Sequence, residues 1–305
     1  MNRKDFLSIA DLTPEEVGRM VDSAGRMKGG EASRSLEGKT IALLFEKPSL
    51  RTRVSFEVGI RQLGGDCIYL SKEDVGLGVR EPESDIAGVL ERWVDGIVAR
   101  VFSHRSLELL AQRASIPVVN ALSDLEHPCQ ALGDLLTIRQ HKGELEGVEV
   151  AFIGDGNNVA SSLALACASV GADFVLASPA GYRVPGFAWE EARKRAAGRA
   201  SRVEWTEDVH KAVDGADVVY TDVWTSMGQE AERAERLKAF DGYRVDEGLF
   251  EAAASDAVFM HDMPAHRGEE VSEGMLEHAR SVIFDQAANR LHAQKAILDS
   301  LFSRE

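Results

Sequence analysis

The chain has few cysteines, few aromatic residues and no long apolar run. Its three cysteines, Cys67, Cys129 and Cys167, form neither an even disulfide set nor a Cys-x-x-Cys metal pair, so we expect free, mostly buried thiols in a reducing cytoplasm. No stretch approaches the roughly 18 consecutive apolar residues that a membrane-spanning helix requires. The N-terminal residues lack the apolar core and cleavage site of a secretory peptide, which predicts a cytoplasmic location.

Basic residues are also in the minority, with 35 Lys and Arg against 50 Asp and Glu and a formal net charge of −15. This balance disfavours nucleic-acid binding, which depends on neutralising phosphates. An anionic substrate would need a local basic pocket, so clustered arginines in this acidic chain are informative.

Short β-rich apolar runs alternate with helical stretches along the 305 residues. An opening helix is expected over 13–28, capped by Thr13 and Glu16, and the tail over 289–303 is strongly helical. The alternation is typical of right-handed βαβ units on parallel sheets. The spacing predicts strands at 39–45, 66–70, 96–100, 117–120, 148–154, 173–177, 218–221 and 258–261.

The length favours two domains of about 150 residues each over a single core. We therefore predict an α/β fold with two open parallel-sheet domains joined by long helices. The first domain is expected to cover 1–140 together with a C-terminal helix, 288–305, that packs back on it. The second is expected to cover 141–287.

The segment Glu46-Lys-Pro-Ser-Leu-Arg-Thr-Arg53 places two arginines and two hydroxyls at a helix N-terminus directly after a strand. Unpaired N–H groups and the positive end of the helix dipole favour an anion there, and the planar fork of arginine matches phosphate oxygens. A capped helix with solvated arginines is the alternative interpretation.

Four later segments place polar side chains near strand ends. They are His127-Pro-Cys-Gln130, Gly154-Asp-Gly-Asn-Asn158, Asp222-Val-Trp-Thr-Ser-Met-Gly228 and His261-Asp-Met-Pro-Ala-His-Arg-Gly268. The second is only superficially a dinucleotide fingerprint, because Val159 occupies its third glycine position and the next strand does not end in an acidic residue.

In order and spacing, these motifs resemble the aspartate/ornithine carbamoyltransferase family over essentially the whole chain. Residues 49–53 match its Ser-x-Arg-Thr-Arg motif, residues 127–130 match its His-Pro-x-Gln motif, and the Ser-Met-Gly run is similar to that of the ornithine branch. The resemblance implies a transferase that moves the carbamoyl group of carbamoyl phosphate to ornithine, giving citrulline and phosphate in arginine biosynthesis. It implies no metal and no organic cofactor.

The resemblance also implies residue roles. Arg53 is expected to brace the phosphate loop, and Gly228 to let the Ser-Met-Gly loop close over the substrate. The ornithine-binding residues would be Asn158, Asp222, Ser226 and Met227. Direct roles in catalysis would fall to Arg100 and His127, which as donors would stabilise a developing oxyanion, and to Asp262 in the place of the family's proton acceptor. The carbamoyl phosphate-binding residues would be Ser49, Leu50, Arg51, Thr52, Arg100, His127, Gln130, Met263 and Arg290.

Among the departures from the family pattern, three bear on the expected chemistry or assembly. Asp262 replaces the cysteine of a His-Cys-Leu-Pro motif, which is the supposed proton acceptor beside the attacking δ-amine. Leu50 replaces the usual threonine of the phosphate loop. Gly76 replaces a polar residue that reaches the neighbouring subunit's site, and Arg80 is near enough in sequence to substitute for it.

Asp262 changes the expected proton chemistry. An alkylammonium has a pKa near ~10 and must lose a proton before it attacks, and cysteine near ~8.5 is a better acceptor than a solvated aspartate near ~3.9. Two close carboxylates raise each other's proton affinity, so Asp222 beside Asp262 could restore a working base.

Several alternatives stay open from the sequence. The acceptor could be a different amine, such as a diamine or a modified ornithine, or the enzyme could run in the catabolic direction. A third alternative is a paralogue that binds carbamoyl phosphate without turnover. The resemblance further implies a homotrimer or a dimer of trimers with sites at subunit interfaces, and we expect no nucleic-acid or membrane partner.

Overall fold

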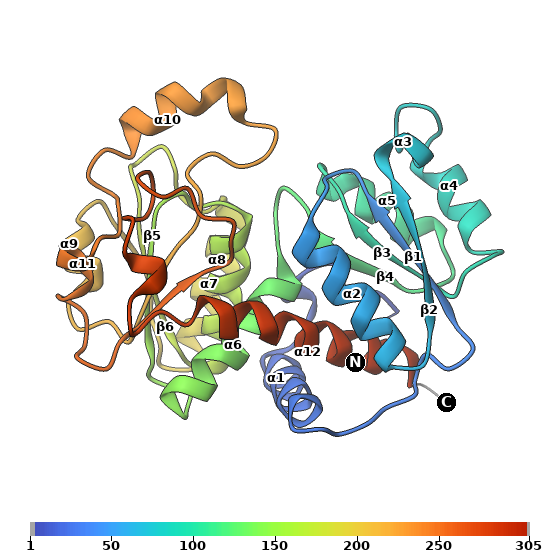
Figure 1. Cartoon of the computed structure of the whole chain (residues 1–305), viewed down its shortest axis with the longest axis horizontal. Helices are drawn as coiled ribbons and strands as arrows, with labels where there is room; N and C mark the ends of the chain where they lie inside the picture. Colours follow the sequence, from blue (N-terminus) through green and yellow to red (C-terminus); the bar gives the residue numbers. More distant parts are fainter. Residues whose placement is uncertain (1–3, 304–305) are drawn as a thin grey trace. The chain divides into compact units, whose positions relative to one another are not determined.

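The computed structural model describes residues 4–303 and divides into two compact units, Met1–Gly133 with Asn289–Glu305, and Asp134–Ala288. Each unit contains one sheet in which every strand pair is parallel (Figure 1). The chain passes between the units within two long helices, α6 (Pro128–Lys142) and α12 (Ile283–Phe302).

The first unit has a four-stranded sheet in the order β2-β1-β3-β4. Its strands are β1 (Thr40–Phe45), β2 (Asp66–Ser71), β3 (Gly96–Arg100) and β4 (Val118–Leu122). Its helices, besides its parts of α6 and α12, are η1 (Ile9–Asp11), α1 (Pro14–Lys28), α2 (Leu50–Gln62), α3 (Lys72–Val75), α4 (Glu83–Leu90) and α5 (His104–Arg113).

Helices cover both faces of this sheet. On one face, α4 and α5 bury Ile86, Leu107 and Leu110 against apolar strand residues. On the other side, α2 packs closely on α12, since a Cβ added at Gly59 would lie 3.4 Å from Leu291 Cδ1. The expected capping box of α1 is present, with Thr13 Oγ1 accepting from Glu16 N and Glu16 Oε2 accepting from Thr13 N.

The second unit has a five-stranded sheet in the order β7-β6-β5-β8-β9. Its strands are β5 (Glu149–Ile153), β6 (Asp173–Ala177), β7 (Val203–Thr206), β8 (Val218–Thr221) and β9 (Val258–His261). Its helices are α7 (Asn158–Val170), α8 (Gly186–Ala197), α9 (Val209–Val213), η2 (Glu230–Glu232), α10 (Arg233–Ala239), α11 (Glu247–Phe250) and η3 (Met275–Glu277).

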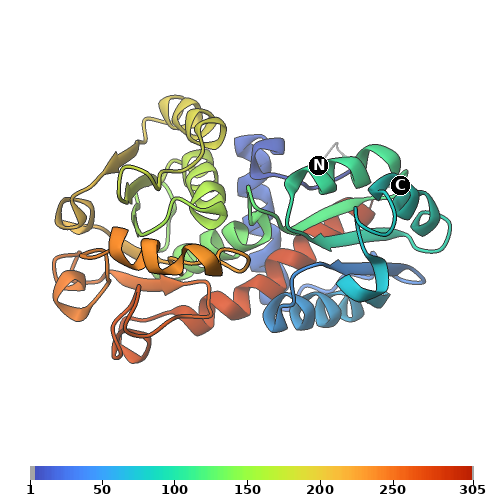
Figure 2. The same cartoon turned by 90° about the horizontal axis from the view of Figure 1, so that it is seen from above.

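Alternating strand residues of the second unit face two different layers, as the period of a strand requires. Ala151, Val175 and Val219 point to the core that α9 and α11 close. Phe152 of the opposite face stacks on Tyr220, with ring centroids 5.2 Å apart. The helices α7 and α8 lie side by side in both views of the molecule (Figures 1 and 2).

The predicted α/β fold with two parallel sheets and a C-terminal helix packed on the first unit is confirmed. All eight predicted strands are present, but the sequence analysis missed β7, an edge strand of four residues of which only Val203 is buried. The cysteines form no disulfide, and Cys129 and Cys167 are buried while Cys67 is half-buried. No helix within residues 4–303 combines the length and apolar character needed to cross a membrane.

Candidate active site

In the first unit, the N-terminus of α2 lies at the carboxyl edge of the sheet. Ser49 is its N-cap, and Ser49 Oγ accepts a hydrogen bond of 3.3 Å from Thr52 N. The preceding loop is held against the end of β3, because Glu46 N donates to Arg100 O at 2.9 Å. In the sheet, β1 has β2 on one side and β3 on the other, so the chain changes direction across the sheet at β1. The loop lies at this switch point, where open α/β sheets bind ligands.

Two arginines converge on Thr52, which is fully buried. Arg100 Nη1 lies 3.4 Å and Arg290 Nη2 lies 2.8 Å from Thr52 Oγ1. Both arginine residues are almost completely buried. Two buried guanidinium groups beside a helix N-terminus concentrate positive charge, which suits a doubly charged anion such as a phosphate ester.

His127 and Gln130 lie at the start of α6, and both are buried. Burial lowers the pKa of the His127 imidazole well below its usual value, and the charges of Arg290 and Arg100 lower it further. His127 is therefore neutral at pH 7. A neutral imidazole and an amide can polarise a carbonyl without adding a charge that would need a counterion.

The remaining residues of the predicted phosphate loop differ in placement. Leu50 begins α2 with 76% of its surface exposed, and Arg51 is half-buried. Arg53 is used elsewhere, because it pairs with Glu57 at 2.8 Å and its guanidinium stacks 3.8 Å from the centroid of the Tyr69 ring. This placement agrees with a bracing role for Arg53.

The segment that contains Gly76 is a tight turn. Gly76 caps α3 with φ +63°, and a Cβ there would lie 2.8 Å from the Arg80 Cβ, so a larger residue would be strained and crowded. Arg80 Nη2 donates to Asp74 O at 2.6 Å. In this structure the Arg80 side chain thus folds back on its own turn.

In the second unit, polar side chains gather at the carboxyl ends of β5 and β8. This is again a switch point, because β5 has β6 on one side and β8 on the other. Asn157 caps α7, with Oδ1 accepting from Val159 N and Ala160 N. Its Nδ2 donates to Asp222 Oδ2 at 2.7 Å. Asn158, the predicted ligand, is the half-buried first residue of α7.

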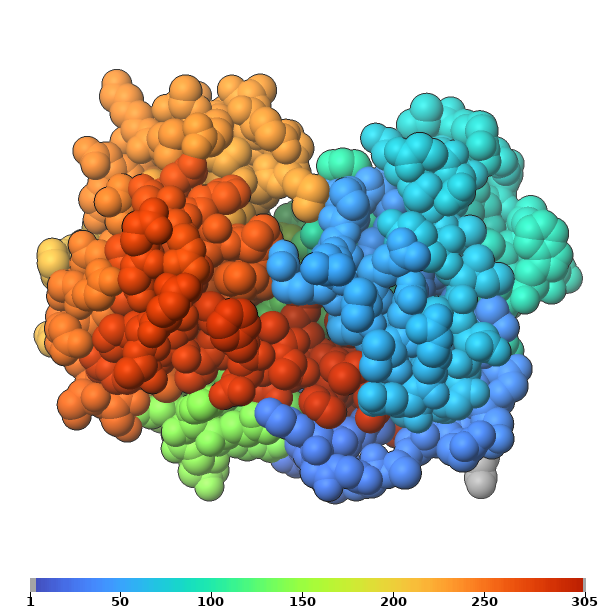
Figure 3. Space-filling model, viewed as in Figure 1, coloured from blue at the N-terminus to red at the C-terminus, as the bar shows by residue number. Residues whose placement is uncertain are grey.

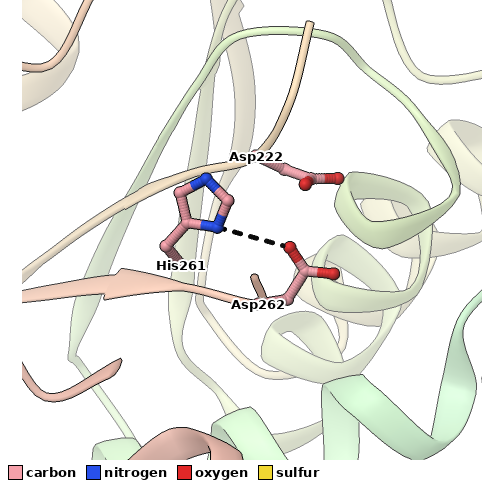
Figure 4. Close-up of side chains that lie close together, drawn as sticks. All are labelled: Asp222, His261 and Asp262. Atoms are coloured by element: carbon pink, nitrogen blue, oxygen red, sulfur yellow. Dashed lines mark ion pairs between the residues drawn. The ribbon is translucent and has the colours of Figure 1, made fainter. Parts of the chain in front are cut away.

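Asp222 and Asp262 follow the neighbouring strands β8 and β9, and their carboxyl groups lie close together beside His261 (Figure 4). Burial raises the pKa of the Asp222 carboxyl well above its usual value, and the charge and hydrogen bond of Asp262 raise it further. Met263, expected among the carbamoyl phosphate ligands, comes next in the chain and belongs to this second unit.

The cluster of Asp222, His261 and Asp262 has the residue types of a metal site, but the contacts of His261 disfavour one. His261 Nδ1 accepts from Met263 N at 2.9 Å, and His261 Nε2 lies 3.2 Å from Glu270 Oε1. Because both ring nitrogens make hydrogen bonds, neither lone pair points to a metal ion.

The Ser226-Met227-Gly228 loop follows Asp222 and leads into η2 and α10. Ser226 N donates to Gln229 Oε1 at 3.1 Å, and Gly228 has φ +96°. Met227 is exposed. The space-filling view shows the light-orange residues of this loop and of α10 at the surface of the unit (Figure 3).

The sequence analysis missed a group of residues that support these loops. Asn157 was given no role, whereas its neighbour Asn158 was named as a ligand, although an asparagine before a helix is a common N-cap. A buried network in which Gln286 Nε2 donates to both Asp134 Oδ1 and Tyr220 OH also had no local signal. Its members are more than 60 residues apart in the chain, so only the fold reveals them.

Two family models match successive parts of the chain. Residues 4–140 match the carbamoyl phosphate-binding domain of aspartate/ornithine carbamoyltransferases, and residues 146–301 match their Asp/Orn-binding domain. The chain is 51% identical over 302 residues to ornithine carbamoyltransferase of Anoxybacillus flavithermus, covering 98% of this chain and 96% of that protein. It is 49% identical over 298 residues to that of Bacillus subtilis, covering 98% and 93%.

A solved structure of ornithine carbamoyltransferase from Pyrococcus furiosus superposes with a TM-score of 0.95 at 48% identity, covering 99% of this chain and 98% of that one. Both domain models and these full-length likenesses lead to one assignment: the chain belongs to the aspartate/ornithine carbamoyltransferase family.

Proposed function

We propose that this protein transfers the carbamoyl group of carbamoyl phosphate to the δ-amine of L-ornithine, giving L-citrulline and phosphate. The observation that carries the proposal is the convergence of Arg100 and Arg290 on Thr52 at the N-terminus of α2. Of these residues, Thr52 and Arg100 lie within the segment that matches the carbamoyl phosphate-binding domain. The relatives named ornithine carbamoyltransferase support ornithine as the acceptor.

The first unit is assigned to carbamoyl phosphate. Its phosphate would receive hydrogen bonds from the backbone and hydroxyls of Ser49, Leu50 and Thr52 and from Arg51 and Arg290. The carbamoyl oxygen would accept from Arg100, neutral His127 and Gln130. These donors stabilise the negative charge that grows on that oxygen when an amine attacks.

The second unit is assigned to ornithine. Asn158, Ser226 and Met227 would hold the α-amino and α-carboxyl groups, while Asp222 would accept from an ammonium. Asp262 would take a proton from the δ-nitrogen, which must become neutral before its lone pair can attack. The nitrogen then bonds to the carbamoyl carbon, and the bond from that carbon to the bridging oxygen breaks to release phosphate.

The test is the initial rate of citrulline formation from carbamoyl phosphate and L-ornithine. We expect turnover that depends on both substrates, and an Arg100→Gln variant should lose at least about 100-fold in kcat because one oxyanion donor is removed. A purified, folded protein that binds carbamoyl phosphate but forms no citrulline would refute the proposal and indicate a paralogue without turnover.

A second candidate acceptor is favoured by the extra carboxylate. Asp262 adds an anionic group, which favours an acceptor of higher net positive charge. A diamine lacks the carboxylate of ornithine, so a diamine is the rival. Putrescine, lysine and N-acylated ornithines as parallel acceptors test this. Ornithine should give the highest kcat/KM, and a higher value for any of the others would move the assignment to that amine.

We also propose a cytoplasmic homotrimer, or a dimer of trimers, that serves arginine biosynthesis. Exposed apolar side chains on the first unit, among them Val54, Ile68 and Val79, support burial against another copy. Light scattering coupled to size-exclusion chromatography should give three or six times the mass of one chain. A monomer at micromolar concentration would contradict the assembly.

A further inference from the structure

Asp222 and Asp262 form a close pair of carboxyl groups. The register pairs Thr221 with His261, so the next residue of each strand leaves the sheet at the same edge. Figure 4 shows the two carboxyl groups beside each other, and their oxygens lie within 4.8 Å. Both side chains are largely shielded from water, with Asp222 buried and Asp262 only 12% exposed.

The neighbours of Asp222 favour at least one negative charge on the pair. Asp222 Oδ2 accepts from Asn157 Nδ2 and Asp222 Oδ1 accepts from Val223 N, each at 2.7 Å. A second negative charge at this distance is disfavoured, because two close buried carboxylates repel each other.

One titratable group, His261, lies against the pair, with its Nδ1 3.6 Å from Asp262 Oδ1 (Figure 4). That nitrogen accepts a hydrogen bond from the Met263 amide at 2.9 Å, so it does not donate one to the carboxylate. The other titratable groups in the vicinity are Glu270 behind His261, Tyr220 with its hydroxyl 3.2 Å from Asp134 Oδ2, and Asp155, which Arg236 pairs at 2.8 Å.

We infer that Asp222 and Asp262 share one proton in the empty enzyme, that the δ-ammonium of ornithine displaces this proton to solvent on binding, and that the pair later takes a δ-proton. The inference rests on the proposed function and specifies its base. The independent indication that an amine is the ligand here is the match of residues 146–301 to an Asp/Orn-binding domain.

The proton balance of the cycle closes. The singly protonated pair loses its proton when the ammonium binds, and the resulting two carboxylates neutralise the cation. One δ-proton then moves to the pair, and the neutral nitrogen bonds to the carbamoyl carbon. As the bond from carbon to the bridging oxygen breaks, the second δ-proton leaves with the phosphate as HPO₄²⁻. The pair ends with one proton, as it began.

Counting protons on binding tests the inference without turnover. Calorimetric titrations in two buffers of different ionisation enthalpy give the number of protons released. The carbamoyl phosphate site is filled with a phosphonate in which a methylene group replaces the bridging oxygen. Ornithine is compared with norvaline, which has the same chain without the δ-amine. At pH 7, ornithine should release about one proton per site more than norvaline.

An Asp262→Asn variant supplies the matched control. Its amide can donate to Asp222, which keeps that carboxylate ionised and leaves no shared proton to displace. The difference between ornithine and norvaline should fall to nearly zero in this variant. The comparison of the two ligands on the wild-type enzyme needs no variant, so the test stands even if Asp262→Asn folds poorly.

Equal proton release by ornithine and norvaline in the wild-type enzyme would overturn the inference, because the δ-ammonium would then displace nothing. The same result is expected if the α-ammonium, which both ligands carry, occupies the pair. Citrulline formation by the same preparation distinguishes failure of the shared-proton inference from failure of the proposed function. Turnover with equal proton counts refutes only the shared proton, whereas absence of turnover refutes the proposed function.

Discussion

Arg236 of α10 donates from Nη1 to Asp155 Oδ2 at 2.8 Å and to Trp224 O at 3.0 Å. Asp155 lies in the turn between β5 and α7, while Trp224 begins the loop that carries Ser226 and Met227. The guanidinium also lies 5.1 Å from the centroid of the Tyr182 ring. One buried side chain therefore fixes both segments that we assign to ornithine.

The buried ion pair of Arg236 with Asp155 predicts a large loss of stability for an Arg236→Gln variant. Burial raises the pKa of Asp155 to about 6, with the opposing charge of Arg236 lowering it. Removing the arginine leaves Asp155 buried without its counterion, so the free energy of unfolding at pH 7 should fall by about 3 kcal/mol. Chemical denaturation measures this, and KM for ornithine should rise because the loop loses its anchor.

Glu232 offers the matched control for this prediction. It pairs with Arg236 Nε at 2.9 Å, but its side chain is 56% exposed. A Glu232→Gln variant should therefore lose less than about 1 kcal/mol. Equal losses in the two variants would show that burial of Asp155 is not what makes the arginine important.

The Thr52 hydroxyl should be needed to position both arginines of the proposed phosphate site. A Thr52→Val variant keeps the side-chain volume but leaves the Arg100 and Arg290 donors without this acceptor. Affinity for carbamoyl phosphate, measured by calorimetry, should fall about 10- to 100-fold, since each lost hydrogen bond to a charged group is worth about 1.5–3 kcal/mol.

Two further variants check that prediction. Thr52→Ser keeps the hydroxyl and should bind within a few-fold of the wild type. Ser55→Ala removes a hydroxyl on the same helix that donates to the Arg51 backbone carbonyl at 2.7 Å and should leave affinity unchanged. A Thr52→Val enzyme with normal affinity would mean that the arginines hold their positions without the hydroxyl.

His127 predicts a specific pH dependence of stability. Its pKa is lowered in the folded protein by burial and by Arg290 and Arg100, so the unfolded chain binds its proton more readily. The stability that neutral His127 contributes is therefore fully present above the unfolded pKa of about 6.5 and is lost as pH falls below it.

Comparison of the wild type with His127→Gln isolates this contribution, because glutamine is neutral and does not titrate. The difference in unfolding free energy, wild type minus variant, should decrease as pH falls from 7 to 5. In nuclear magnetic resonance titrations, the His127 ring should show no protonation between pH 8 and 6. A midpoint inside that range would contradict a neutral oxyanion donor.

Much of the fold could be predicted because local pattern and global architecture agree. After their first residue, the runs at 40–45 and 149–153 are entirely apolar and buried. Such continuous apolar runs are typical of parallel strands that are covered on both faces. β7 was missed because only the first of its four residues is buried, and an exposed edge strand has a weak apolar signal.

The candidate site was predicted unevenly for a similar reason. Motifs within one segment, such as Ser49 to Thr52, carry their chemistry in local order, whereas Arg290 meets Thr52 across 238 positions. The family resemblance placed both residues among the carbamoyl phosphate ligands, but it gave no sign of the contact between Asp155 and Arg236. The juxtaposition of Asp222 and Asp262 was expected, while the supporting amide of Asn157 needed the folded chain.

Leu50 provides the last prediction because its side chain is exposed at the first position of α2. Leu50→Thr adds a hydroxyl beside the backbone donors of the helix N-terminus and removes no packing, so stability should stay within about 0.5 kcal/mol. Carbamoyl phosphate should bind up to about 10-fold more tightly, the value of one added hydrogen bond to an anion. Leu50→Val, which adds no hydroxyl, should leave affinity at the wild-type level. Equal affinity of the threonine and valine variants would show that the backbone N–H at this position already satisfies the phosphate, and the departure at Leu50 would then have no cost for binding.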